Sequence, residues 1–202
     1  MTLSTEQGFP LWVTLGTMLR GWALAEQGQA EEGLAQMRQG LVAYQATGAE
    51  SARPLYLAML TEAYRKVGQP EEGLSVLAEA VATAYKTGER FYEAELYRLK
   101  GELTLQQFKV QGSTFNVDNP QSAFHNPQSE AEEYFHKAIE IARRQSAKSL
   151  ELRAVMSLSR LWQRQDKKEE ARKLLAEIYG WFTEGFDTAD LQEARALLAE
   201  IS

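Results

Sequence analysis

The chain has 202 residues, 44% of them hydrophobic and 25% charged, which is the composition of a globular protein. Its formal net charge of -6 argues against a nucleic-acid partner, because phosphate binding requires a broad basic surface. The sequence has no cysteine, which excludes disulfides, thiolate nucleophiles and cysteine metal sites. It also has no apolar run near the roughly 20 residues that span a bilayer. The amino-terminal residues do not have the pattern of a signal peptide, so we expect no export signal. We therefore expect a cytoplasmic protein without a membrane segment.

Internal repetition is the strongest signal along the chain. Residues 21–40 align with residues 61–80 at a shift of forty, and the turn GQAEEGL at 28–34 recurs as GQPEEGL at 68–74. At equivalent helical positions of the repeats, a small residue recurs and a large residue lies close to it. Small residues allow two antiparallel helices to approach closely, and large neighbours fill the space beside them. This pattern predicts helix pairs like those of tetratricopeptide repeats (TPR-like pairs).

The repeats predict four helix pairs followed by one further helix. We expect the pairs at about 5–48, 51–87, 89–146 and 148–182, and a capping helix at 187–201. The last helix is interpreted as a cap, because a repeat array needs a terminal unit with a polar outer face. The predicted fold is an all-α, TPR-like α-solenoid with a right-handed superhelix, formed as a single repeat domain over residues 1–202.

The third pair contains an insertion at about 107–128, where no helical pattern continues. The tetrapeptide NPQS occurs there twice, and Asn-Pro pairs are typical of helix breaks. Two interpretations remain open: a binding loop anchored by Phe115 and Phe124, or a tolerated surface insertion.

Local signals mark the starts of two second helices. Ser129 with Glu132, and Asp166 with Glu169, have the spacing of capping boxes. Asp166 also stands where the equivalent turns of the first two repeats carry glycine. We expect these residues to cap the second helices of the third and fourth pairs.

The first helix of each TPR-like pair is expected to line a concave groove. The repeat alignment makes this groove apolar at its amino-terminal end and basic at its carboxy-terminal end. Eight residues are therefore candidates for binding a partner: Met18, Trp22, Arg65, Lys66, Arg98, Arg153, Arg160 and Arg164.

Two interpretations of the basic end remain open. Arg153, Arg160 and Arg164 lie seven and four residues apart on one helical face, which suits the carboxylates or phosphates of an acidic peptide. Alternatively, Glu95 and Glu102 occupy the same repeat positions on the neighbouring first helix and would pair with these arginines in a ladder. At the apolar end, aromatic residues at helical spacing serve either as anchors for a partner or as core.

The sequence offers little for catalysis or metal binding. Glu133 and His136 are three residues apart on one predicted helix, but a single such motif is a weak metal signal. Paired glutamates at 31–32, 71–72 and 132–133 recur in the first turns of second helices, where they complement the helix dipole. No phosphate-binding GxxxxGK[ST] motif is present. We expect no enzyme activity, no catalytic or metal site and no cofactor.

Four strings carry a resemblance to a known family: RGWALAEQGQAEEGLAQMRQGL at 20–41, TGERFYEAELYRLKGEL at 87–103, EAEEYFHKAIEIARRQSAKSLELRA at 130–154 and IYGWFTEGFDTADLQEARALL at 178–198. They resemble the carboxy-terminal TPR-like region of large bacterial signalling ATPases, which are adenylate-cyclase-like or LuxR/MalT-like multidomain proteins. The resemblance implies a sensor or partner-binding part that works with an ATPase or cyclase domain. The insertion at 107–128 departs from the family pattern.

Together these observations predict a protein-interaction or regulatory-sensor module that binds a protein or peptide, with an acidic peptide as one option, in its groove. The alternative is a structural module that forms homo-oligomers through exposed terminal repeats. Trp12 and its apolar neighbours before the first complete repeat motivate that alternative.

Overall fold

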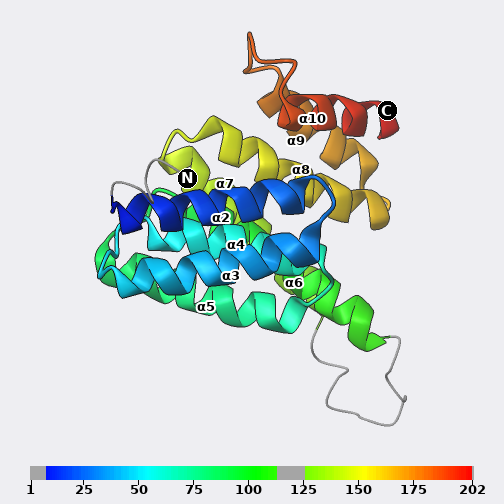
Figure 1. Ribbon diagram of the computed structural model, residues 1–202. Helices are drawn as coiled ribbons and strands as arrows, with labels where there is room; N and C mark the ends of the chain where they lie inside the picture. The colour runs from blue at the N-terminus through cyan, green and yellow to red at the C-terminus, as the bar shows by residue number, and fades with distance from the viewer. Residues whose placement is uncertain (1–7, 113–125, 202) are drawn as a thin grey trace. The chain divides into compact units, whose positions relative to one another are not determined.

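The computed structural model describes residues 8–112 and 126–201, which form α-helices joined by turns (Figure 1). No strand occurs within these ranges, and none of their helices is long and apolar enough to cross a membrane. The helices are α2 (Pro10–Glu26), α3 (Ala30–Ala46), α4 (Arg53–Lys66), α5 (Pro70–Thr87), α6 (Glu93–Gly112), α7 (Pro127–Arg144), α8 (Lys148–Arg164), α9 (Lys168–Tyr179) and α10 (Ala189–Glu200).

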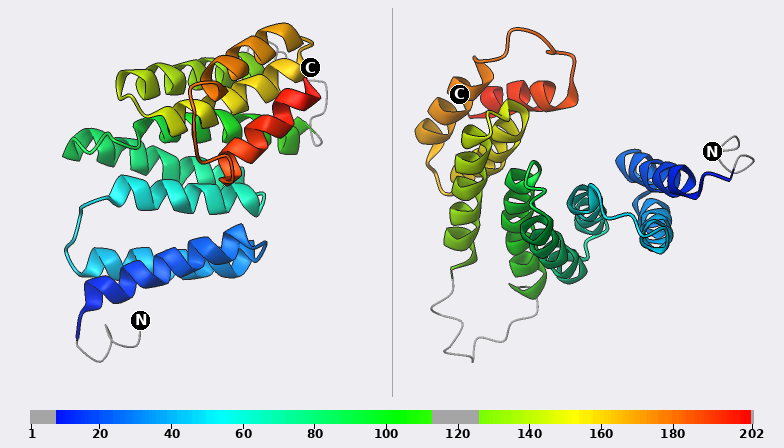
Figure 2. Two further views of the ribbon diagram at one scale, coloured as in Figure 1. Left: turned by 90° about the horizontal axis from the view of Figure 1, so that it is seen from above. Right: turned by 90° about the vertical axis from the view of Figure 1, so that its left-hand side faces the viewer.

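The chain divides into two compact units, residues 1–90 (unit 1) and 91–202 (unit 2). Unit 1 contains the pairs α2/α3 and α4/α5, and unit 2 contains α6/α7, α8/α9 and the last helix, α10. The two helices of each pair lie side by side along most of their length (Figure 2). The single continuous domain and its right-handed superhelix stay predictions.

Left-handed residues end the helices at a regular interval. They occur at positions 28, 48, 68 and 88, all glycines with φ between 74° and 86°. The same interval of twenty residues separates Ser146 from Asp166, which have φ of 55° and 63°. Glycine reverses the chain at this conformation without the steric cost that other residues carry. The turns therefore repeat along the chain as regularly as the helices do.

The capping predictions were wrong at both helices. Asp166 adopts the left-handed conformation that ends α8, and the residue before α9 is Lys167, which makes no side-chain cap. At α7 the cap is Asn126, whose Oδ1 accepts hydrogen bonds from the backbone amides of Gln128 at 3.1 Å and Ser129 at 3.4 Å. The local sequence pattern located the starts of these helices but identified the wrong capping residue in each.

The predicted insertion is also too long at both ends. Helix α6 continues to Gly112 and α7 begins at Pro127. Proline is favoured in the first helical turn, where its missing N–H has no partner to lose, so this Asn-Pro pair starts a helix instead of breaking one. Phe115 and Phe124, the proposed loop anchors, lie outside the described residues.

Glycines bring α2 and α3 of unit 1 into close contact. A Cβ atom added to Gly33 would lie 2.5 Å from the carbonyl oxygen of Gly21, and one added to Gly21 would lie 2.7 Å from that of Gly33. A Cβ added to Gly40 would lie 2.5 Å from Cγ of Met18. The expected role of small residues as close-contact points between antiparallel helices is therefore visible in this pair.

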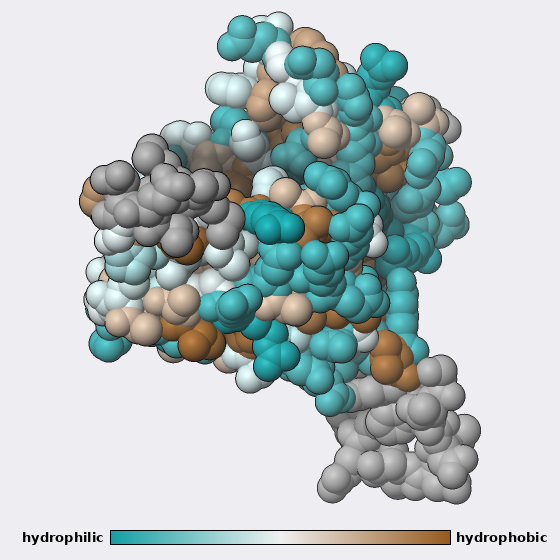
Figure 3. Space-filling model, in the orientation of Figure 1, coloured by the Kyte–Doolittle hydropathy of each residue, from teal (hydrophilic) through white to brown (hydrophobic). Residues whose placement is uncertain are grey.

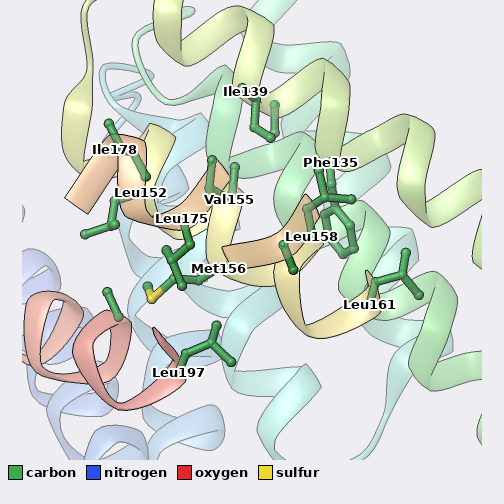
Figure 4. Close-up of a cluster of buried hydrophobic side chains, with 14 of the residues drawn as sticks. Phe135, Ile139, Leu152, Val155, Met156, Leu158, Leu161, Leu175, Ile178 and Leu197 are labelled. Atoms are coloured by element: carbon green, nitrogen blue, oxygen red, sulfur yellow. The ribbon is translucent and has the colours of Figure 1, made fainter. Parts of the chain in front are cut away.

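In unit 2 the core gathers side chains from α7, α8, α9 and α10 (Figure 4). Phe135 of α7 is completely buried, and its ring fills the space above Gly101 of α6. Helix α10 contributes Leu191, Ala194 and Leu197 to this core. Most of its other residues are exposed, so α10 has the apolar inner face and polar outer face of a cap.

Candidate functional site

The outer side of α2 carries four large apolar residues, which we call the α2 stripe: Trp12, Leu15, Leu19 and Trp22. Residues three and four positions apart share one face of a helix, so the four lie in a row. Trp12 is 62% exposed, Leu19 50% and Trp22 40%, and Leu15 is half-buried. Apolar side chains also reach other parts of the molecular surface between hydrophilic ones (Figure 3).

The opposite side of α2 is buried. Thr14, Met18, Gly21 and Ala25 face the core of unit 1, so α2 has apolar or small residues on both sides. A surface helix of a globular protein usually has a polar outer face. The α2 stripe is therefore the kind of surface that binds another apolar surface.

Met18 must be removed from the candidate partner-binding residues. It is only 1% exposed and contacts Gly40 of α3. The equivalent residues Ala58, Arg98 and Met156 are buried as well. The sequence alignment identified the correct repeat position but placed it on the wrong side of the first helices, because one residue turns the face of an α-helix by about 100°.

The charged candidates of unit 1 lie in ion pairs. Lys66 of α4 binds Glu26 of α2 with Nζ and Oε1 2.6 Å apart. Arg65 donates to both carboxylate oxygens of Glu62 at 2.7 and 3.0 Å. All four side chains are partly exposed, so each pair contributes little to stability. The Glu26–Lys66 pair lies next to the α2 stripe, because Glu26 follows Trp22 by four residues on the same face of α2.

The first helices of unit 2 contain a buried ionic network centred on Glu95 of α6. Arg98 donates to both oxygens of this carboxylate at 2.7 and 2.9 Å, and Arg153 of α8 lies 3.0 Å from Oε1. Glu95 is 3% exposed and Arg98 7%. Ser157 links the network to Glu102 by donating a hydrogen bond of 2.6 Å. Burying these charges is tolerated because each has an oppositely charged partner.

Helix α10 supplies two further acidic partners. Arg160 lies 2.5 Å from Glu193, and Arg153 lies 4.0 Å from Asp190. Burial raises the pKa of Asp190 above its ordinary value, although Arg153 opposes the shift. Burial and the nearby Glu95 also raise the pKa of the Tyr92 phenol, to which Arg153 is hydrogen-bonded.

The arginine ladder therefore forms in part. Arg153 pairs with Glu95, as that interpretation requires, but Arg160 pairs with Glu193 of α10 instead of Glu102. Arg164 is exposed in the last turn of α8 and makes no ion pair within residues 8–112 and 126–201. Most of the positive charge expected for a ligand is thus neutralised inside unit 2.

The weak metal motif at Glu133 and His136 belongs to a packed surface. His136 lies against the ring of Trp162, with ring centroids 5.8 Å apart, and Trp162 Nε1 donates a 2.7 Å hydrogen bond to Glu132. In the part of the chain that the structure describes, no group of three or more potential ligands could hold a metal ion. His136, Glu132 and Trp162 therefore contribute to the contact between α7 and α8.

Sequence reasoning missed three residues that shape these surfaces: Leu19, Asp190 and Glu193. It named Trp12 as a self-association residue but did not connect it with Leu19. The signal for that connection was the spacing of apolar residues at 12, 15, 19 and 22, which identifies a row of side chains. No comparable signal identified the two acidic residues, because pairing with α8 depends on where α10 packs.

Solved structures of TPR-like repeats are similar to this chain in fold. The crystal structure of the nearly identical TPR-like repeats of a putative kinesin light chain from Podosopora anserina matches with a TM-score of 0.60 and 20% identity, covering 95% of this chain and 86% of that one. A single-substitution variant of the same repeats matches with a TM-score of 0.60 and 19% identity, covering 95% and 85%. No family model and no curated protein matches the sequence. The all-α, TPR-like fold predicted from the repeats is confirmed.

Proposed function

We propose that this protein is a protein-interaction module whose main contact surface is the α2 stripe. The observation that carries the proposal is the exposure of Trp12, Leu19 and Trp22 in one row on a helix whose other side is already packed. TPR-like repeats present surfaces of this kind to other proteins and are typically not catalytic. Exposed tryptophans are also the residues that most often dominate binding energy at protein interfaces.

The chemistry of the α2 stripe favours an apolar partner segment. An amphipathic helix that packs against a row of side chains at this spacing would bury the two indole rings. The Glu26–Lys66 pair would form a polar edge at the carboxy-terminal end of the α2 stripe, and Arg65 precedes Lys66 on α4. Trp22, Arg65 and Lys66 therefore stay candidates, with Trp12 and Leu19 added.

An acidic peptide is a weaker candidate for unit 2. Arg98, Arg153 and Arg160 would have to exchange their carboxylate partners for those of a ligand, at the cost of leaving Glu95 or Glu193 without its ion pair. Arg164 is the member of this set that could bind a carboxylate without breaking an ion pair described above.

The resemblance of the sequence to the TPR-like region of bacterial signalling ATPases supports a regulatory role. We propose that it serves as a sensor or docking part beside an ATPase or cyclase domain of the same system, in the cytoplasm. The assembly role is the second candidate, because the α2 stripe would also suit contact with another copy of the chain.

Site-specific photo-crosslinking in cells that make the protein tests the proposal. A benzophenone side chain would replace Trp22 in one variant and Val42, a 68% exposed residue of α3, in the control. We expect protein adducts from position 22 and few from position 42. Absence of adducts at position 22, or equal yields at both positions, would contradict the proposed surface.

A further inference from the structure

The α2 stripe has a palindromic spacing. Trp12, Leu15, Leu19 and Trp22 follow one another at intervals of three, four and three residues, so the order Trp-Leu-Leu-Trp is the same from either end. These intervals are those of the a and d positions of a heptad, which form the seam between two packed helices. Two antiparallel copies would therefore place Trp12 opposite Trp22 and Leu15 opposite Leu19, and each contact would occur twice.

We propose that the α2 stripe binds a second copy of this chain through a two-fold symmetric, antiparallel contact between the two α2 helices. This inference rests on the proposed function and names the partner of the same surface. A two-fold contact requires one patch to be complementary to itself, and a palindromic row of side chains meets that requirement. The facing tryptophans supply the aromatic pairs that anchor such contacts.

The charges around α2 favour a copy of the chain over a charged partner. Arg20 is the one charged residue between Phe9 and Trp22. The antiparallel pairing places it opposite Thr14 of the other copy, so two stripes can meet without opposing like charges. Glu26, which continues the row beyond Trp22, is already paired with Lys66 at 2.6 Å. Because each chain has a formal net charge of -6, two copies repel each other at long range. Added salt should therefore strengthen this contact, whereas it would weaken binding of a basic peptide, which the net negative charge attracts.

The contact is small. Stable complexes bury about 800 Å² on each partner, and one row of four side chains on a single helix provides less. The expected dimer is weak, with a Kd on the order of 10 to 100 µM. It would form when the protein is locally concentrated and dissociate on dilution.

Sedimentation equilibrium of the purified full chain from about 1 to 300 µM tests the pairing. We expect a monomer–dimer equilibrium that shifts toward dimer as salt increases. Leu15→Glu and Leu19→Arg should each raise the Kd at least tenfold. An equimolar mixture of the two variants should recover dimer, because the antiparallel arrangement places Glu at position 15 of one chain opposite Arg at position 19 of the other. Val42→Glu on α3 is the matched control and should behave like the wild type.

Three outcomes would overturn the inference: a monomer throughout the range, a dimer insensitive to both charge substitutions, or loss of dimer without recovery in the mixture. Circular dichroism must show native helicity for each variant, and Trp12→Ala, at a 62% exposed site, replaces either variant that fails this check. If position 22 cross-links only to a different protein and the chain sediments as a monomer, the proposed function stands and pairing with a second copy is rejected. Lack of any adduct at position 22 together with a monomer would reject both.

Discussion

The first helices of the two units use equivalent repeat positions in opposite ways. Leu15 and Trp22 of α2 correspond, eighty residues later, to Glu95 and Glu102 of α6. In unit 1 these positions form part of an exposed apolar row, whereas in unit 2 they bind arginines in a largely buried network. Small residues at the helix contacts preserve the repeat, so the outer positions can change from apolar to ionic without changing the fold. These positions of α2 therefore leave a surface open for binding, whereas the equivalent positions of α6 stabilise unit 2.

The largest expected effect comes from removing the centre of the ionic network. Glu95→Ala should lower the free energy of unfolding by about 3 kcal/mol, because Arg98 and Arg153 would lose a shared, buried partner. Glu62→Ala in unit 1 is the matched control, since Glu62 also pairs with an arginine three residues later but is more exposed. It should cost about 1 kcal/mol or less. Equal losses in urea unfolding would mean that burial does not distinguish the two pairs.

A methyl group at the glycine contact of unit 1 should have the next largest effect. Alanine is favoured over glycine by about 1 kcal/mol in an open helix, but the Cβ of Gly33→Ala would lie 2.5 Å from a backbone oxygen of α2. We expect a net loss of about 2 kcal/mol in chemical unfolding. Gly101→Ala in unit 2 should cost a similar amount, because its Cβ would lie 2.5 Å from the ring of Phe135, which is completely buried. A stabilised Gly33→Ala variant would show that the close contact does not exist.

The ion pair of Glu151 should give a pH-dependent effect. Burial disfavours its charge, but hydrogen bonds from Arg143 at 2.6 Å and Lys148 at 2.8 Å outweigh burial and lower the pKa of Glu151. A lowered pKa stabilises the folded state above the unfolded value of about 4.3, and this contribution is lost as the pH falls through the folded pKa. Glu151→Gln should therefore cost about 1.5 kcal/mol at pH 7 and progressively less in acid.

Thermal unfolding of wild type and Glu151→Gln between neutral and acidic pH measures this effect. Glu140→Gln, at an exposed position of α7, is the control and should match the wild type at every pH. A difference that persists unchanged in acid would show that the loss comes from packing instead of charge.

The smallest expected effect concerns the turns. Asp166 adopts φ of 63° where the equivalent turns of unit 1 have Gly28 and Gly68. Asp166→Gly should stabilise the protein by about 0.5 kcal/mol, because glycine adopts this conformation without strain. The reciprocal change, Gly68→Asp, should destabilise it by a similar amount in the same thermal assay. Effects of the same sign for both changes would contradict the equivalence of the turns.

Much of the fold could be predicted from the sequence because its signals are local. Glycine at positions 28, 48, 68 and 88 marks the places where the chain reverses, and the small residues between them mark the helix contacts. The capping residues were assigned wrongly, because serine, aspartate and asparagine all suit a helix start and only the backbone conformation distinguishes them.

The sequence by itself determined that this protein is a series of TPR-like helix pairs, because turn chemistry and close helix contacts depend on residues near one another in the chain. Only the tertiary structure decided which side of each first helix remains exposed. Met18 is buried because Gly40 of α3 lies against it, while Leu19, one residue later, points outward. It also decided that Arg160 pairs with Glu193, since ion pairing depends on the distance between helices and not on repeat position.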